Sequence, residues 1–424
     1  MARSIVPNYL ITEFDKILNR KYFSKEVVPV RKKAFDNFIQ NGLPNKNLEG
    51  WQHTDLSDIK KSDFRIAEID DGPQEKVDLS QYGLESFHTI VIYNGHFQEN
   101  ISSVPEGVKL LSNLEYLEQK NWKVSQPERS PFDLMNTAFM DSGVSLVIEK
   151  GAEITNPLRI LFVCSGDQKL MTNPRVYIDL EHSSSLTLIE EHAGECNKYL
   201  LNESMIIDIE ANARLEHIRI QDNSRSTINM GNIHVGQQND SNYTFVQFAK
   251  GSGLGRVNIF ADLIGEGANS SINGLSLSND NQHLDTNIVT SHLAPHCKSG
   301  QNFKSILKDH SSGFFNGRTI VQKGAEKTDS NQSNKNLLLS KNALMNSNPQ
   351  LEIYTDDVKC SHGSSTGALE EDALFYIKSR GIDGESATSL LVHGFASEII
   401  ETIKNDIIRD HILGQFNKWL DKSN

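Results

Sequence analysis

Residues 176–185 read Val-Tyr-Ile-Asp-Leu-Glu-His-Ser-Ser-Ser, a strand-like run that stops at a cluster of small polar residues. β-Branched and aromatic residues favour strands, and clustered serines favour turns. The runs at 88–95 and 144–149 have the same texture and are also broken by Gly, Asn or Ser. The middle of the chain therefore reads as short strands joined by turns.

The turns in this region recur at a nearly constant interval. Their centres lie 27 to 32 residues apart, at Ala152, Ser184, Asn212, Ser241, Ala268 and Cys297. Periods of this length are typical of stacked repeat folds, and strands without intervening helices favour a parallel β-helix with one coil per repeat. An all-β sandwich would also contain short strands and polar turns, but it requires no constant step. In a β-helix, some of the many Asn and Gln residues in 268–348 could stack on one another at the corners of the coils.

Helical patterns dominate both ends of the chain. Leu10, Phe14 and Ile17 form an apolar stripe at helical spacing, and Gly42 is expected to close a second helix. The expected architecture is mainly β, with a right-handed parallel β-helix core (86–365) between an N-terminal helical region (1–85) and a C-terminal helical region (366–424).

The C-terminal region is expected to begin with a helix that Thr366 caps and Gly381 ends. Gly394 is expected to break a second helix, which begins near Glu385. In a last helix, an apolar stripe recurs every four residues, at Ile408, Ile412, Phe416 and Leu420. That stripe could pack on the body of the protein or dock a partner, and the sequence leaves both interpretations open.

Composition narrows the class of protein. The 424 residues carry a formal net charge of −13 without a Lys/Arg block, so nucleic acid is an improbable partner. No apolar run approaches the roughly 20 residues that cross a bilayer, and the N-terminus has no secretory pattern. Only four cysteines occur, far apart in the chain. We therefore expect a cytoplasmic protein with free thiols and no membrane contact.

Cys360 and His362 are the most informative candidates for chemistry. Two residues apart on an extended strand, their side chains point to the same face. A thiol and an imidazole can bind iron or zinc, carry sulfur or relay a proton. Zinc and iron–sulfur sites usually take four ligands, so any site built on this pair is open or shared with another chain.

Two further clusters resemble metal sites but have plainer interpretations. His292, His296 and Cys297 surround Pro295, which argues against the helix that would align the two imidazoles, so we expect turn and core residues. The acidic run 190–192, Glu-Glu-His, is expected to be a solvated corner. The chain contains no P-loop pattern, so we expect it to bind no nucleotide.

Longer motifs carry a family resemblance. They are Cys360-Ser-His-Gly363, Thr366-Gly367, Leu374-Phe-Tyr-Ile-Lys-Ser-Arg-Gly381, His292 to Cys297, Gln301 to Lys304, Phe315 to Gly317, Gln332 to Ser340, Pro349 to Ile353 and Glu49 to Leu56. With these motifs the chain resembles the SufB/SufD family of the SUF iron–sulfur cluster assembly machinery. The Ser-His-Gly form at 361–363 favours the SufD branch, because SufB typically carries Glu-His-Glu there.

The resemblance implies a function. Proteins of the SufD branch pair with SufB through their β-helices, and each recruits one SufC ATPase through its C-terminal helices. By motif match, the resemblance implies that His362 and Cys360 are ligands of a transient iron–sulfur cluster shared with SufB. The implied role is a non-catalytic scaffold subunit, with a homodimer possible for the isolated chain. Two other classes stay open: a β-helix polysaccharide lyase or hydrolase, and a purely structural interaction protein.

Overall fold

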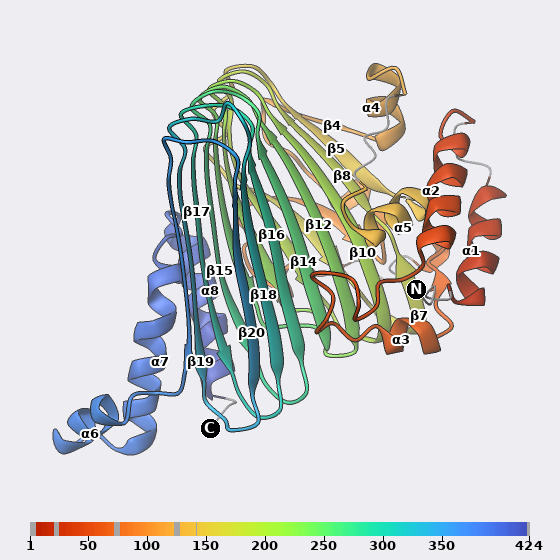
Figure 1. Cartoon of the computed structure of the whole chain (residues 1–424). Helices are drawn as coiled ribbons and strands as arrows, with labels where there is room; N and C mark the ends of the chain where they lie inside the picture. The colour runs from red at the N-terminus through yellow and green to blue at the C-terminus, as the bar shows by residue number, and fades with distance from the viewer. Residues whose placement is uncertain (1–5, 21–24, 72–76, 123–127, 141, 422–424) are drawn as a thin grey trace.

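Two parallel sheets wound into one solenoid dominate the structure (Figure 1). The computed structural model describes residues 6–20, 25–71, 77–122, 128–140 and 142–421. In this part of the chain the strands wind through about eight coils, each coil contributing one strand to each sheet. The prediction of a mainly β protein with a parallel β-helix and helices at both ends is confirmed.

The first sheet is the longer one and has the order β20-β18-β16-β14-β12-β10-β8-β5-β4, with β7 and β1 attached through β10. Its strands are β1 (Arg65–Ile66), β4 (Val108–Leu111), β5 (Gly143–Ile148), β7 (Gly166–Thr172), β8 (Arg175–Leu180), β10 (Cys196–Ile209), β12 (Thr227–Gln237), β14 (Leu254–Leu263), β16 (His283–His292), β18 (Ser312–Val321) and β20 (Leu344–Ile353).

The second sheet faces the first across the solenoid interior and has the order β21-β19-β17-β15-β13-β11-β9-β6-β2-β3. Its strands are β2 (His88–Tyr93), β3 (His96–Phe97), β6 (Leu158–Val163), β9 (Ser185–Ala193), β11 (Arg214–Gln221), β13 (Asn242–Ala249), β15 (Asn269–Ser278), β17 (Lys298–Leu307), β19 (Asp329–Leu338) and β21 (Lys359–Gly367). Successive coils pair in parallel and in register, so equivalent residues of neighbouring coils lie beside one another.

The predicted turns form one corner of the solenoid. At this corner each coil places one residue in the left-handed backbone region, at Ser183, Asn212, Asp240, Gly267 and His296. Short polar residues and glycine tolerate that conformation best, which explains why the turns could be recognised from composition. The constant spacing of the turns therefore reflects one corner per coil.

Asparagines stack along the outer face of the first sheet. Nδ2 of Asn348 donates to Oδ1 of Asn316 (3.0 Å), Asn316 to Asn287 (2.7 Å), Asn287 to Asn258 (3.2 Å) and Asn258 to Asn232 (3.0 Å). We call this row the asparagine ladder. Stacking was expected at the corners, but the ladder runs through the middle of the strands, where the in-register pairing brings equivalent positions together.

The N-terminal segment covers part of the asparagine ladder. Arg256 donates to the Gly50 carbonyl (2.7 Å), and its guanidinium lies 3.8 Å from the centre of the Trp51 ring. A cation over an indole face is a favourable contact, particularly when it is desolvated as here. This contact explains why the Glu49 to Leu56 motif belongs to the body of the protein although it is distant in sequence.

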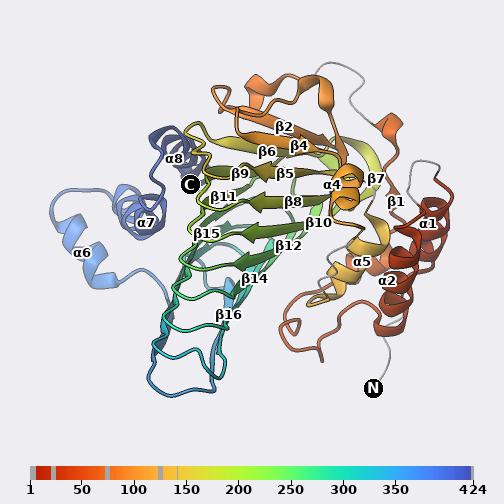
Figure 2. The same cartoon turned by 90° about the horizontal axis from the view of Figure 1, so that it is seen from above.

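The helices flank the solenoid on opposite sides (Figure 2). The N-terminal and inserted helices are α1 (Asn8–Leu18), α2 (Val28–Asn41), α3 (Ser57–Lys61), α4 (Asn113–Gln119) and α5 (Pro131–Phe139), with 3-10 turns at Ile69–Asp71, Leu79–Tyr82 and Glu99–Ile101. Phe14 of α1 stacks on Phe35 of α2 with ring centres 3.8 Å apart. Gly42, with φ +72°, follows the end of α2 as predicted.

Three helices form the C-terminal region: α6 (Glu371–Ser379), α7 (Gly384–Ile400) and α8 (Asp406–Asp421). In both views α7 and α8 lie against the second sheet, whereas α6 stands away from the body. None of the described helices is both long and apolar enough to cross a membrane.

Two expectations for this region are wrong. Thr366 does not cap a helix, because it belongs to β21, where Asn336 of β19 donates to its hydroxyl (3.1 Å). Gly394 does not break α7, which runs unbroken through it. A helical glycine costs only about 1 kcal/mol, and the burial of Val392 and Ala396 on either side of Gly394 outweighs that cost.

We predict that Asn287→Ala destabilises the protein, because the Nδ2 group of Asn316 loses its acceptor and Oδ1 of Asn258 keeps only the Arg256 donor. Each buried polar group left without a partner costs about 1–3 kcal/mol. The urea midpoint, measured by circular dichroism, should fall clearly. Asn331→Ala, an exposed asparagine of β19, is the matched control and should change stability by less than about 0.5 kcal/mol. Equal midpoints for the two variants would show that the ladder contributes nothing.

Candidate functional site

Strand β21 ends the second sheet, and its inward-facing side chains are exposed because none of the described elements forms a further coil over them. The in-register pairing with β19 sets Cys360 beside Ser330 and His362 beside Gln332. Ser330 and Gln332 are buried and point into the solenoid. Cys360 and His362 therefore belong to the interior face of the last coil, as their alternate spacing predicted.

The two side chains differ in their surroundings. His362 is exposed, and Cys360 is partly buried. Burial raises the pKa of the Cys360 thiol, and the nearby Asp329 carboxylate raises it further. The thiol is therefore protonated at neutral pH and would need a bound cation to become a thiolate ligand.

The interior becomes polar toward this free end. In register with His362, the inward-facing column runs through Leu188, His217, Phe245, Ile272, Gln301 and Gln332. Gln301 donates to Thr290 (3.1 Å) and Gln332 donates to Thr319 (2.8 Å), while the amide oxygen of each glutamine has no hydrogen-bond partner among the described residues. His362 therefore stands above a polar interior rather than a sealed apolar core.

The rim of the free end is unusually apolar and unpaired. In the described part of the chain β20 and β21 are the last strands of their sheets, so each has one edge without a neighbouring strand there. Leu344, Ile353 and Tyr354 at the ends of β20 are 57%, 41% and 53% exposed. Free strand edges beside exposed apolar side chains are typical of surfaces that receive another chain.

The second predicted cluster does not form a site. His292 is enclosed in the interior, where it bonds to the Ser299 hydroxyl (2.8 Å). His296 is exposed at the corner, with φ +59°. Cys297 is buried and its thiol donates to the Gly265 carbonyl (3.3 Å). These are core and turn residues, as their setting around Pro295 indicated.

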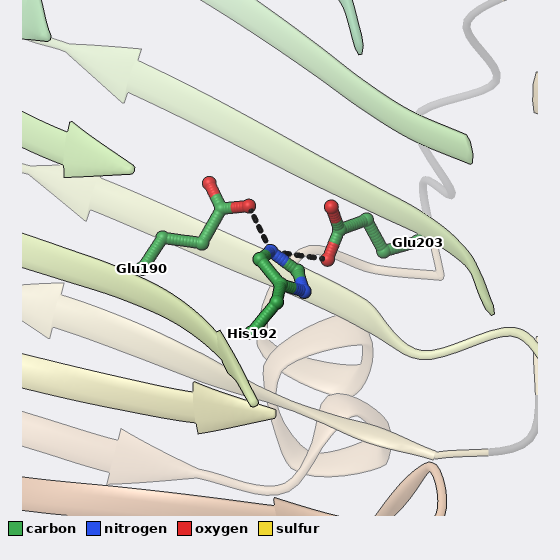
Figure 3. Close-up of side chains that lie close together, drawn as sticks. All are labelled: Glu190, His192 and Glu203. Atoms are coloured by element: carbon green, nitrogen blue, oxygen red, sulfur yellow. Dashed lines mark hydrogen bonds and ion pairs between the residues drawn. The ribbon is translucent and has the colours of Figure 1, made fainter. Parts of the chain in front are cut away.

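The expected solvated corner at 190–192 is wrong. Glu190 and His192 lie inside the solenoid on β9, and Glu203 of the opposite sheet meets them there (Figure 3). The strand continues through these residues, so the side chains of Glu190 and His192 point into the solenoid instead of facing solvent. Arg219 of β11 joins the group by donating to Glu190 (2.6 Å) and Glu203 (2.7 Å). We call these four residues and His217 the interior cluster.

The carboxylates of the interior cluster differ in protonation. Although burial opposes ionisation, Arg219 and the two imidazoles hold the pKa of Glu190 well below its usual range. Burial and the neighbouring Glu190 raise the pKa of Glu203 well above its usual range. Burial, assisted by Arg219, lowers the pKa of His192 to about 4. Glu190 is thus ionised at neutral pH, whereas His192 is neutral.

Two buried thiols also come together although they are distant in sequence. The sulfur atoms of Cys164 and Cys196 lie 3.0 Å apart, and the Thr227 hydroxyl is 3.3 Å from Cys196. All four cysteines are free. Cys164 directly follows β6 of the second sheet, and Cys196 is the first residue of β10 of the first sheet.

The predicted docking stripe of the last helix is covered by the protein itself. Ile408, Ile412 and Phe416 are fully buried and Leu420 is 4% exposed, all in one apolar cluster with the outer face of the second sheet. The most exposed apolar side chains of this region are outside the stripe: Phe375 (75%) and Tyr376 (60%) on α6, Leu390 (55%) on α7 and Ile407 (52%) at the start of α8.

Sequence reasoning missed Glu203, His217 and Arg219. A signal was present, since each is a charged or imidazole residue in a strand-like run that also contains several apolar residues. The sequence could not show which face of each strand points into the solenoid. It therefore could not show that the three residues meet.

Two family models and several curated proteins are similar to this chain. The family model described as "SUF system FeS cluster assembly, SufBD core domain" matches residues 162–395, and the "SufBD protein N-terminal region" matches residues 9–160. The iron–sulfur cluster assembly protein SufD of Escherichia coli is 27% identical over 397 residues, covering 92% of this chain and 93% of its own.

Two other relatives are of similar identity. An iron–sulfur cluster assembly SufBD family protein of Synechocystis is 29% identical over 408 residues, covering 89% of this chain and 87% of its own. The chloroplastic protein ABCI7 of Arabidopsis thaliana is 29% identical over 403 residues, covering 90% of this chain and 83% of its own.

We predict that His292 makes the protein sensitive to acid. Burial lowers the pKa of His292 to about 4, from the ordinary histidine value of 6.5. Between these values the unfolded chain binds the proton and the folded chain does not, so stability falls as pH drops from 6.5 toward 4, by up to about 3 kcal/mol. Urea midpoints measured across this range should fall less steeply for His292→Gln than for the parent protein. His182→Gln, at an exposed histidine, should keep the parent slope; identical slopes for all three proteins would contradict the prediction.

Proposed function

Since the chain belongs to the SufB/SufD family, which serves iron–sulfur cluster assembly by the SUF system, we propose that it is a SufD-type scaffold subunit and not an enzyme. The observation that carries this proposal is the exposed His362 above Cys360 on the uncovered end of the solenoid. A surface that offers two ligand types and no more is suited to holding a cluster only together with another chain.

The proposed partner at the free end is a SufB homologue. The unpaired edges of β20 and β21 can continue their ladders into the strands of a second β-helix, and the apolar rim would be buried in that contact. His362 would then supply an imidazole to the nascent cluster, and SufB would supply a thiolate. In the absence of SufB, a second copy of the chain could occupy the same edges as a homodimer.

Within this proposal the cluster is cargo and not a resident cofactor. A neutral imidazole binds iron but does not hold it as firmly as a full set of thiolates. Cys360 can join as a ligand once a metal displaces the thiol proton, whose pKa is raised. A ligand set divided between two chains would release its cluster when the chains move apart.

The proposed site for the SufC ATPase is the exposed apolar face of α6 and α7. This replaces the Ile408–Leu420 stripe, which is buried against the second sheet. Phe375, Tyr376 and Leu390 present aromatic and aliphatic anchors of the kind that dominate binding energy. Nucleotide would be bound by SufC, and the complex would work in the cytoplasm.

We predict that His362→Ala leaves the complex intact but lowers cluster formation. The full chain is co-expressed with SufB and SufC homologues and purified without oxygen, and cluster content is measured by visible absorption and iron analysis. Loss of a residue that only supports a metal ligand already lowers metal affinity or activity 10- to 100-fold. Loss of the ligand itself should therefore lower the cluster yield by about tenfold or more. His310→Ala, an exposed corner histidine, is the control and should retain parent yield. Loss of the complex, or an unchanged cluster yield, would show that His362 is not a ligand of the cluster.

We predict that the double variant Phe375→Ser, Tyr376→Ser loses SufC while keeping SufB. Removal of two exposed anchors should weaken SufC binding by about 2 kcal/mol, roughly thirtyfold in Kd. Binding is measured by titration of the purified SufB-containing complex with SufC. Leu48→Ser, at an apolar residue 44% exposed in the N-terminal region, should bind normally. Normal SufC binding by the double variant would place the ATPase on another surface.

A further inference from the structure

The interior cluster is not used by the proposed function, yet it gathers metal-binding groups from both sheets. We propose that Glu190, His192 and Glu203 form an enclosed site for a divalent first-row transition metal ion such as Fe²⁺, Mn²⁺ or Zn²⁺. The proposal does not rest on the SUF function, because its ligands are separate from His362 and Cys360.

The donor atoms are spaced as a metal site requires. Nε2 of His192 lies 2.7 Å from Oε1 of Glu190 and 3.3 Å from Oε2 of Glu203, and the three donor atoms all lie within 4.8 Å of one another (Figure 3). Ligand atoms that each lie about 2.1 Å from one ion are about 3 Å from one another. The observed separations bracket that value without any change in the backbone.

One ligand atom lacks a hydrogen-bond partner where an ion would sit. Oε2 of Glu203 forms no hydrogen bond with any described residue, although the side chain is enclosed in the solenoid with 3% of the residue exposed. It faces the Nε2 atom of His192. A buried carboxylate oxygen without a partner is costly, and a cation at the cluster would satisfy it.

The single guanidinium of the cluster leaves one carboxylate oxygen available to a cation. Two carboxylates share a single guanidinium, that of Arg219, and both imidazoles are enclosed with them. Arg219 engages Oε1 of each glutamate, which leaves Oε2 of Glu203 open toward the cluster.

Surrounding residues hold the proposed ligands in place. His217 contacts Oε2 of Glu190 (2.9 Å) through Nε2 and the Tyr243 hydroxyl (3.2 Å) through Nδ1. The Phe162 ring stacks on the His192 imidazole, with ring centres 4.9 Å apart and planes 7° from parallel. Outer partners of this kind orient the ligands of metal sites.

A glycine keeps the space around Glu203 open. Gly231 pairs with Glu203 on the neighbouring strand, and a Cβ atom there would lie 2.8 Å from Oε1 of Glu203 and 3.0 Å from Nη2 of Arg219. Its backbone conformation needs no glycine, since φ is not in the left-handed region. A glycine is therefore needed at this position because any side chain would collide with Glu203 and Arg219.

The ligand chemistry identifies the class of ion. Two carboxylates and an imidazole suit Fe²⁺, Mn²⁺ or Zn²⁺, while a site for Ca²⁺ or Mg²⁺ would be built from oxygen alone. Because the site is fully enclosed, the ion would enter as the solenoid folds and would then exchange slowly.

Cobalt tests this inference on the full chain. The protein is produced in medium supplemented with Co²⁺, so that the ion is present during folding, and is washed with chelator before elemental analysis. We expect about one cobalt per chain, with only nitrogen and oxygen neighbours at about 2.0–2.2 Å in X-ray absorption spectra. A sulfur neighbour, or no retained cobalt, would overturn the proposal.

Variants assign the ion to the cluster. Glu203→Gln removes a charged ligand while keeping its shape, and Gly231→Ala fills the space beside it; each should lower retained cobalt by about tenfold or more. His292→Gln, at an enclosed imidazole outside the cluster, should retain cobalt, as should His362→Ala. The latter result separates this inference from the proposed function. Equal cobalt in the parent protein and Glu203→Gln would overturn the assignment, and the parent spectra decide the case if the cluster variants do not fold.

Discussion

The structure depends on the parallel, in-register hydrogen bonding of each coil to the next. A strand in the middle of the solenoid satisfies its backbone groups on both sides, and every residue acquires an equivalent residue one coil away. The same constraint that builds the body cannot be met at the last coil, where β20 and β21 keep a free edge. The end of the solenoid is thus a consequence of how the rest is held together, and the proposed site lies there because side chains that would be interior in any other coil are uncovered.

In-register stacking also decides which polar residues the interior tolerates. The early coils bury Leu186, Leu188 and their apolar neighbours, whereas the late coils bury serines, glutamines and asparagines that bond to one another. Glu190, Glu203 and Arg219 are charged groups enclosed where residues of both sheets meet. A buried ionic group of this kind contributes little stability compared with apolar packing, so its presence is better explained by a ligand or a specific geometry than by stability alone.

Much of the fold could be predicted from the sequence because one corner per coil imposes a period on turn residues. Serine, asparagine and glycine at that corner are visible without any structure, and the spacing of Cys360 and His362 fixes their common face on a strand. The sequence could not show that Glu190 and His192 point inward, since that depends on the path of the strand through the solenoid. It also could not show that α7 passes through Gly394, because the compensating burial is tertiary, or that the Ile408–Leu420 stripe is already covered.

The asparagine ladder has a direction. Every amide in it donates its Nδ2 hydrogen toward the preceding coil, from Asn348 through Asn316, Asn287 and Asn258 to Asn232. The amide dipoles are therefore aligned head to tail, and their effects add along the axis of the solenoid. The negative pole of this row is the side-chain oxygen Oδ1 of Asn348 in the terminal coil. A chain that approaches end-on consequently meets a weakly electronegative surface on the first sheet, which would favour an amide or a cationic group as its nearest neighbour there.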